Sequence, residues 1–181
     1  MMRSFAPPGA PALLTILPLI SVGFSGACFG FFFAWQSSTL RGLDMIDPAT
    51  AIEAMQAMNA SVRNPLFGAV YFGTPLVLTL AVVVMAVLRA RLAAVVLGLA
   101  LALHMAGVFG VTAALNVPMN RELAEVDAQA PGADTIWQAY STRWQSANLV
   151  RMIAAGGCLM LVAATLTPAV QNRRRSRALP C

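Results

Sequence analysis

Charged residues are scarce in this 181-residue sequence, and lysine is absent altogether. Only 10% of the residues are charged and 59% are apolar, whereas an average soluble domain has roughly 25% charged residues. A soluble chain of this length would need many more charges to cover its surface. The composition therefore indicates an integral membrane protein, with the lipid bilayer as its surroundings. The net charge of +5 comes from arginines spread among apolar segments, so we expect no nucleic-acid partner.

Long apolar runs, by contrast, are abundant. A helix needs roughly 20 residues to cross about 30 Å of hydrocarbon, and four runs reach that length. They cover residues 12–35, 65–88, 92–115 and 148–167. We expect one transmembrane domain over residues 1–181, an all-α four-helix bundle with two outer loops, 36–64 and 116–147, that are amphipathic and helical. The second and third runs should form a tight hairpin, and Pro75 should kink the second.

The charges divide between the two ends of this bundle. One end carries Arg3, Arg89, Arg91 and the basic tail, residues 168–181, without any acid. The other end carries every acidic residue of the chain, namely Asp44, Asp47, Glu53, Glu122, Glu125, Asp127 and Asp134. Arginine-rich segments stay in the cytoplasm, so we expect both termini to be cytoplasmic. The use of arginine without lysine suggests a bacterial genome, which makes the inner (plasma) membrane the expected location of this multi-pass protein.

Residues that bind metals are too few for a metal site. His104 is the only histidine, no acid lies within an expected span, and the cysteines are dispersed. These numbers fall short of the ligand sets of zinc or non-haem iron, so we expect no metal and no cofactor. Haem held by His104 and a methionine is the weaker alternative. A lone histidine in the middle of a span is more often hydrogen-bonded within the bundle.

The first outer loop contains a helix pattern, "DPATAIEAMQAMNASVRNP". Asp47 can cap this helix, with proline following in its first turn. Gln56, Asn59 and Arg63 recur at spacings of three and four, which places them on one face. The face is either a binding surface at the outer mouth of the bundle or a solvated polar stripe.

In the second outer loop, Asn116 and Asn120 bracket Pro118. We expect Pro118 to break the third span and to leave backbone carbonyls that asparagine amides can bind. Asn120 is then a candidate cap for a short helix starting at Arg121. Taken alone, these residues are more typical of helix ends than of a binding site.

A stripe of aromatic and polar residues leads into the fourth span. Trp137, Tyr140, Trp144, Asn148 and Arg151 follow at spacings of three and four, so they share one face of a helix that descends into the membrane. The aromatic residues could form an interfacial belt, and Arg151 could extend outward to headgroups. However, a face with both Asn148 and Arg151 is costly against lipid, which favours the bundle interior.

Three ordered motifs, "MQAMN", "NVPMNRELA" and "WQAYSTRWQSANLVR", make the chain resemble the DUF1772 or anthrone oxygenase-like family of small four-helix membrane proteins. The resemblance covers most of the chain, from Asp47 through the fourth span. The matching positions are Gln56 and Asn59 in the first motif, Asn116, Pro118 and Asn120 in the second, and Trp137, Tyr140, Trp144, Asn148 and Arg151 in the third. Characterised fungal members oxidise anthrones to anthraquinones.

The resemblance implies an apolar slot for a flat aromatic substrate and a cationic or amide pocket for the oxyanion that forms before dioxygen reacts. The catalytic candidates are Arg151, Asn148 and Asn116. The substrate-binding candidates are Gln56, Asn59, Asn120, Trp137, Tyr140 and Trp144. For the general base the choice lies between His104 and Tyr140, and a phenol, with an ordinary pKa of about 10, is a weak base.

A function of another class fits the same residues. A membrane module that binds a lipid, a quinone or a partner protein at the outer mouth would also use an amphipathic loop helix and an aromatic stripe. Turnover separates the two, because a binding module retains its ligand unchanged. The sequence leaves enzymatic activity and oligomeric state open.

Overall fold

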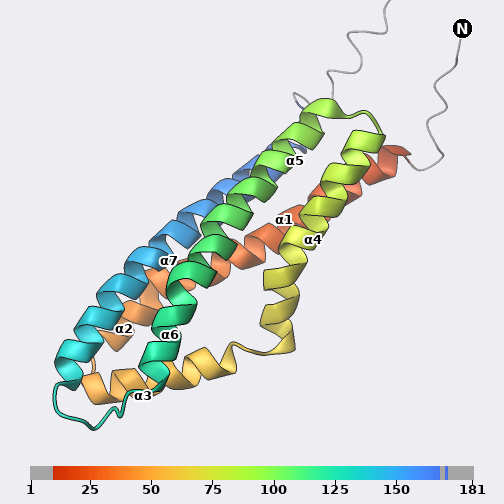
Figure 1. The fold of residues 1–181 in the computed structure, drawn as a ribbon. Coiled ribbons are helices and arrows are strands. Elements are labelled where there is room, and N and C mark those ends of the chain that lie inside the picture. Colours follow the sequence, from red (N-terminus) through yellow and green to blue (C-terminus); the bar gives the residue numbers. More distant parts are fainter. Residues whose placement is uncertain (1–9, 168–169, 171–181) are drawn as a thin grey trace, which may run out of the picture.

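The structure, a computed structural model, describes residues 10–167 and 170. All secondary-structure elements in this part of the chain are helices, and four of them are long and apolar enough to cross a membrane (Figure 1). The expected all-α, four-helix membrane architecture is confirmed. In chain order the elements are α1 (Ala10–Ala34), the π-helical turn η1 (Trp35–Thr39), α2 (Leu40–Leu43), α3 (Pro48–Ser61), α4 (Pro65–Val87), α5 (Arg91–His104), the π-helical turns η2 (Met105–Gly110) and η3 (Thr112–Asn116), α6 (Val117–Ala124) and α7 (Ala133–Ala164).

The long helices form a closed ring in the order α1, α4, α5, α7, in which each packs against its two neighbours. Near the hairpin between α4 and α5 the ring is filled by apolar side chains, among them Leu17, Met85, Leu97 and Val162. Arg89 turns the chain between these helices with a left-handed φ of 57°. α4 contains Pro75 and bends part-way along its length (Figure 1).

The third and fourth long helices extend far beyond the apolar runs. The third continues from α5 through η2, η3 and α6, over Arg91–Ala124, and its 34 residues span about 50 Å at 1.5 Å per residue. Because α7 already begins at Ala133, the segment expected as an outer loop, 116–147, is mostly helix. Pro118 does not break the third helix, contrary to expectation. It lies in the first turn of α6, directly after the π-helical turn η3, and such a local π adjustment lets a helix continue through a proline.

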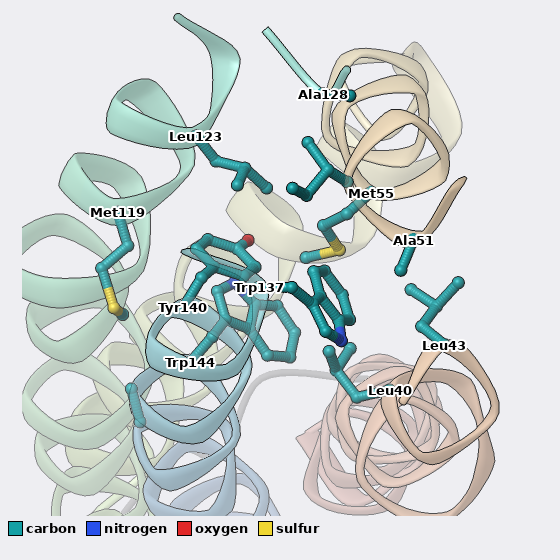
Figure 2. Close-up of a cluster of buried hydrophobic side chains, with 12 residues drawn as sticks. Leu40, Leu43, Ala51, Met55, Met119, Leu123, Ala128, Trp137, Tyr140 and Trp144 are labelled. Carbon is teal, nitrogen blue, oxygen red and sulfur yellow. The ribbon is translucent and has the colours of Figure 1, made fainter. Parts of the chain in front are cut away.

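The α3 helix lies across the ends of the long helices that are opposite the hairpin between α4 and α5 (Figure 1). As expected, Asp47 caps it, accepting from the backbone N–H of Thr50 at 3.0 Å. Underneath is a second apolar core, in which Met55 of α3 meets Leu40 of α2, Leu123 of α6 and the aromatic residues of α7 (Figure 2). This core fixes α3 over one end of the bundle.

Close packing of η2 against α7 leads to a prediction about stability. A Cβ at Gly107 would lie 2.3 Å from the Cβ of Ala154, whereas nothing lies within 4 Å of a Cβ at Gly98. We expect Gly107→Ala to destabilise the protein by about 1–3 kcal/mol through overpacking. The matched variant Gly98→Ala should be neutral or slightly stabilising. Thermal unfolding in detergent compares them, and equal midpoints would contradict this packing.

The basic tail and Arg3 lie outside the described residues. Arg89 and Arg91 lie at the hairpin, at the same end as Leu17 and Val162.

Candidate active site

A cavity of about 490 Å³ lies between the first half of α4 and the η3–α6 segment, with α1 and α7 behind it. Exposed residues, among them Arg63, Asn64 and Phe72, form its rim. Asn116, Trp144 and Arg151 are buried and therefore form its floor. Six of its sixteen lining residues are aromatic, namely Phe31, Trp35, Phe67, Tyr71, Phe72 and Trp144. No aspartate or glutamate is among its lining residues in the part of the chain that the structure describes.

Arg151 points into the bundle and is only 5% exposed. Its Nη2 donates to Oδ1 of Asn148 at 3.0 Å, and its Nη1 donates to Oγ1 of Thr112 at 3.4 Å. The guanidinium carbon lies 4.7 Å from the ring centre of Phe32 and 4.9 Å from that of Trp144, within cation–π range. Its Nε has no partner among the described residues. The cation is therefore held by amide, hydroxyl and ring contacts, as expected for a span without acids.

Asn148 is fully buried and fixes the position of Arg151. Its Nδ2 donates to the backbone oxygen of Phe32 at 3.1 Å and to Oε1 of Gln36 at 3.0 Å. With both donor contacts on that side, Oδ1 faces the guanidinium. Asn148 does not line the cavity, so the structure places it behind Arg151 as a positioning residue.

Asn116 lines the cavity and is only 1% exposed. Neither its Nδ2 nor its Oδ1 has a hydrogen-bond partner in the described part of the chain. The expectation that it binds helix-end carbonyls is therefore wrong. A buried amide without partners costs roughly 1–3 kcal/mol, and a ligand with a polar atom would satisfy it.

The π-helical turn η3 presents two of the polar residues of the cavity. Thr112 begins this turn and Asn116 ends it, and both line the cavity. Such turns shift the side chains out of the regular helical register and are frequent at functional sites.

Asn120 sits within α6, so it does not cap a helix starting at Arg121. Its Oδ1 accepts from the hydroxyl of Tyr140 and from Nε1 of Trp144, both at 2.9 Å. The Tyr140 oxygen in turn accepts from Nδ2 of Asn59 at 3.4 Å. These contacts tie α3, α6 and α7 together at the cavity, which Asn59, Asn120 and Trp144 line.

The family comparison bears directly on this geometry. A family model of anthrone oxygenase matches residues 65–170. The chain belongs to the anthrone oxygenase family. The matched segment includes Asn116, Asn120, Asn148 and Arg151 but not Gln56 or Asn59. The comparisons with curated proteins and with solved structures found no match.

Three of the six substrate-binding candidates lie away from the cavity of this anthrone oxygenase family member. Gln56 donates to the backbone oxygens of Leu123 and Val126 at 2.8 and 2.9 Å, which ties α3 to the end of α6. Nε1 of Trp137 donates to Oδ1 of Asp44 at 3.1 Å. Tyr140 lies in the core under α3 and reaches the cavity only through Asn59 and Asn120.

Several lining residues were absent from the sequence-based site, above all Tyr71 and Thr112. Tyr71 stacks on Phe109 with ring centres 4.3 Å apart and on Phe67 at 5.4 Å. Phe31 and Phe67 also line a second cavity of about 330 Å³ between α1, α3 and α4. Phe67 and Tyr71 are four residues apart on one helical face, and this spacing is the one sequence signal that could have indicated the wall, although it was not used.

His104 is fully buried in the bundle, and neither of its ring nitrogens has a hydrogen-bond partner among residues 10–167 and 170. The expectation of a hydrogen-bonded histidine is therefore wrong. It does not line the cavity either. Within the described residues, no three His, Cys, Asp or Glu side chains are grouped so that they could hold a metal ion.

Proposed function

We propose that the protein oxidises the central methylene of an anthrone-type tricyclic ketone with dioxygen, and that its own residues suffice without metal or haem. The observation that carries the proposal is the pairing of Arg151 with Asn116. Both are buried, both have hydrogen-bonding atoms without partners among the described residues, and both line one cavity with aromatic side chains in its wall. Membership of the anthrone oxygenase family supports the same class of reaction.

The cavity suits such a substrate in size and in chemistry. Ligand pockets have volumes of about 300–1,000 Å³ and combine apolar walls with a few polar groups, and this cavity has about 490 Å³. Flat aromatic rings pack favourably against side chains such as those of Phe67, Tyr71 and Trp144. The ketone oxygen would then lie at the floor, where Arg151 and Asn116 can donate to it.

In the proposed reaction, the methylene first loses a proton to give an enolate with its charge on the ketone oxygen. Arg151 and Asn116 stabilise this charge, as the donors of an oxyanion hole do. Dioxygen then adds to the electron-rich ring carbon and a hydroperoxide forms. Loss of water from it creates the second carbonyl. One ketone and one dioxygen thus give one quinone and one water, and the four electrons lost by the carbon reduce both oxygen atoms.

Among the described residues, no carboxylate and no histidine lines the cavity, and the phenol of Tyr71, which does line it, is a weak base for the first step. His104 lies outside the cavity, and the Tyr140 hydroxyl is engaged with Asn120 and Asn59. We therefore assign the proton to water at the rim. In this account the protein accelerates the step by stabilising the enolate at Arg151 rather than by removing the proton itself.

A glycine on the wall gives a steric test of the cavity. Gly68 lines it, and nothing lies within 4 Å of a Cβ placed there. Gly68→Leu should fill the space that the rings occupy and lower the rate of quinone formation about tenfold or more, while the fold stays intact. The matched control is Gly23→Leu, at an exposed position with equally open surroundings. Equal losses in both variants would show that the cavity is not the site.

We also propose that both termini are cytoplasmic, in a bacterial inner membrane. The hairpin with Arg89 and Arg91 then faces the cytoplasm, in keeping with the positive-inside tendency. The cavity lies at the opposite end of the bundle, so its rim faces outward and the substrate arrives from the outer leaflet or the outer solution.

The function is tested with membranes that contain the protein, supplied with an anthrone under air and under nitrogen. Quinone should form faster than in membranes without the protein, and only with oxygen present. An anthrone that binds and is released unchanged would instead identify a binding module.

A further inference from the structure

The charged residues that line the cavity, among those the structure describes, are all positive. Two arginines, Arg63 and Arg151, are among its lining residues, and in the described part of the chain no acid is. Two of the seven acids at this end of the molecule have hydrogen-bond partners away from the cavity: Asp44 accepts from Trp137, Ser141 and Gln145, and Asp47 caps α3. An uncompensated positive cavity favours an anionic ligand.

The two arginines lie at different depths. Arg151 is buried at the floor, whereas Arg63 is exposed at the rim, in the short connection between α3 and α4. The enolate oxygen of the proposed reaction accounts for Arg151 only. The proposed reaction gives Arg63 no role. Its position at the rim would allow it to bind a second negative group at the other end of the ligand.

The start of α4 adds to the positive potential at the rim. Asn64, next to Arg63, caps this 23-residue helix, and its Oδ1 accepts from the backbone N–H of Phe67 at 3.0 Å. The N-terminus of a helix carries a partial positive charge of about half an elementary charge. Arg63 and the helix end therefore both add positive potential at the rim, whereas the amide of Asn116, which has no partner among the described residues, lies at the floor.

We propose that the physiological ligand is an aromatic ketone that bears a carboxylate, and that Arg63 binds the carboxylate at the rim while the ring oxygen lies at Arg151. A carboxylate matches the planar guanidinium fork, which can donate two parallel hydrogen bonds to it. The inference rests on the proposed function for the aromatic body of the ligand. It adds the charged group that sets specificity and the direction in which the ligand enters.

The experiment compares two probes of equal shape, anthracene-2-carboxylate and the neutral anthracene-2-carboxamide, bound to the detergent-purified protein and followed by tryptophan fluorescence. Exposed ion pairs contribute up to about 1 kcal/mol, which corresponds to about fivefold in affinity. The carboxylate should therefore bind about three- to fivefold more tightly than the amide. This preference should fall as salt is added, because Arg63 is exposed.

Substitutions of single arginines test which residue causes the preference for the carboxylate. Arg63→Gln should abolish it and leave binding of the amide unchanged, and Arg63→Lys should retain part of it. Arg121→Gln removes the same charge from an exposed residue of α6 that does not line the cavity, and it should keep the preference. Equal affinity for the two probes, a preference that survives Arg63→Gln, or no binding of either probe would overturn the inference.

Binding of these probes needs no oxygen and no turnover. The binding experiment can therefore contradict the carboxylate site without contradicting the proposed reaction, and the oxidation experiment can do the reverse. If a neutral anthrone is not oxidised while the Arg63-dependent preference is present, the proposed reaction is wrong and the anion site stands. If the anthrone is oxidised and Arg63→Gln changes no affinity, the reaction stands and the carboxylate site is wrong.

Discussion

Arg151→Gln is expected to lower the rate of quinone formation about 10²- to 10³-fold. Loss of one donor from an oxyanion hole has an effect of this size, because the donor acts on a charge that develops only during the reaction in a site with little water. Glutamine is shorter than arginine and keeps an amide donor, but it removes the charge and the cation–π contacts with Phe32 and Trp144. The rate is measured in membranes with equal amounts of folded protein.

A second variant separates charge from geometry. Arg151→Lys keeps the positive charge but cannot bridge Asn148 and Thr112 with one planar group. We expect an activity between that of the intact protein and that of Arg151→Gln. Full activity of Arg151→Gln in folded protein would remove Arg151 from the mechanism.

Asn116→Leu is expected to have opposite effects on activity and on stability. The rate should fall about 10²-fold, because a donor to the enolate oxygen is lost. The free energy of unfolding should stay equal or rise, since the substitution removes a buried amide that has no partner and replaces it with an apolar group of similar size. Quinone formation and thermal unfolding of the same preparation measure the two effects.

Asn148→Leu is the matched control for that experiment. Asn148 is also a buried asparagine, but its amide contacts Phe32, Gln36 and Arg151. Its loss leaves those groups unsatisfied and should destabilise the protein by about 1–3 kcal/mol. If Asn116→Leu lowered the unfolding temperature as much as Asn148→Leu does, the amide of Asn116 would have a structural partner and its assignment to a ligand would be wrong.

The fold could be predicted largely from composition. A bilayer requires long apolar helices, so the four spans follow from their hydropathy alone. The stripe on α7 was also predictable, because a helix with Trp144, Asn148 and Arg151 on one face can bury that face only inside the bundle. The cap at Asp47 followed from local chemistry.

The cavity could not be predicted in the same way. Its wall on α4 consists of aromatic residues such as Phe67 and Tyr71, and in an apolar span such residues look the same whether they face lipid or a ligand. The path of α6 was also missed, since Pro118 signals a helix end in the sequence. In the structure the π-helical turns η2 and η3 precede it, so Pro118 lies in the first turn of the next helix segment. Asn120 then points inward at Tyr140 and Trp144 instead of capping a helix.

Hydrogen-bond partners in the structure distinguish polar residues of the candidate site that the sequence could not tell apart. Gln56 and Asn59 appeared on one polar face of the first loop helix, and Asn116 and Asn120 appeared on either side of Pro118. Gln56 turned out to bind the backbone of the α6 end, Asn120 holds two aromatic side chains, and Asn116 is left without a partner. Such differences depend on contacts between α3, α6 and α7, which a single sequence does not contain.

The most direct measurement of the central claim is simultaneous recording of dioxygen uptake and quinone formation by the purified protein with an anthrone, alongside Arg151→Ala and protein-free detergent. The account predicts one dioxygen consumed for each quinone formed, at a rate well above that of the detergent alone, and a loss of this rate in Arg151→Ala. A rate no higher than that of the detergent, or an equal rate in Arg151→Ala, would contradict the assignment of this cavity as an oxygenase site.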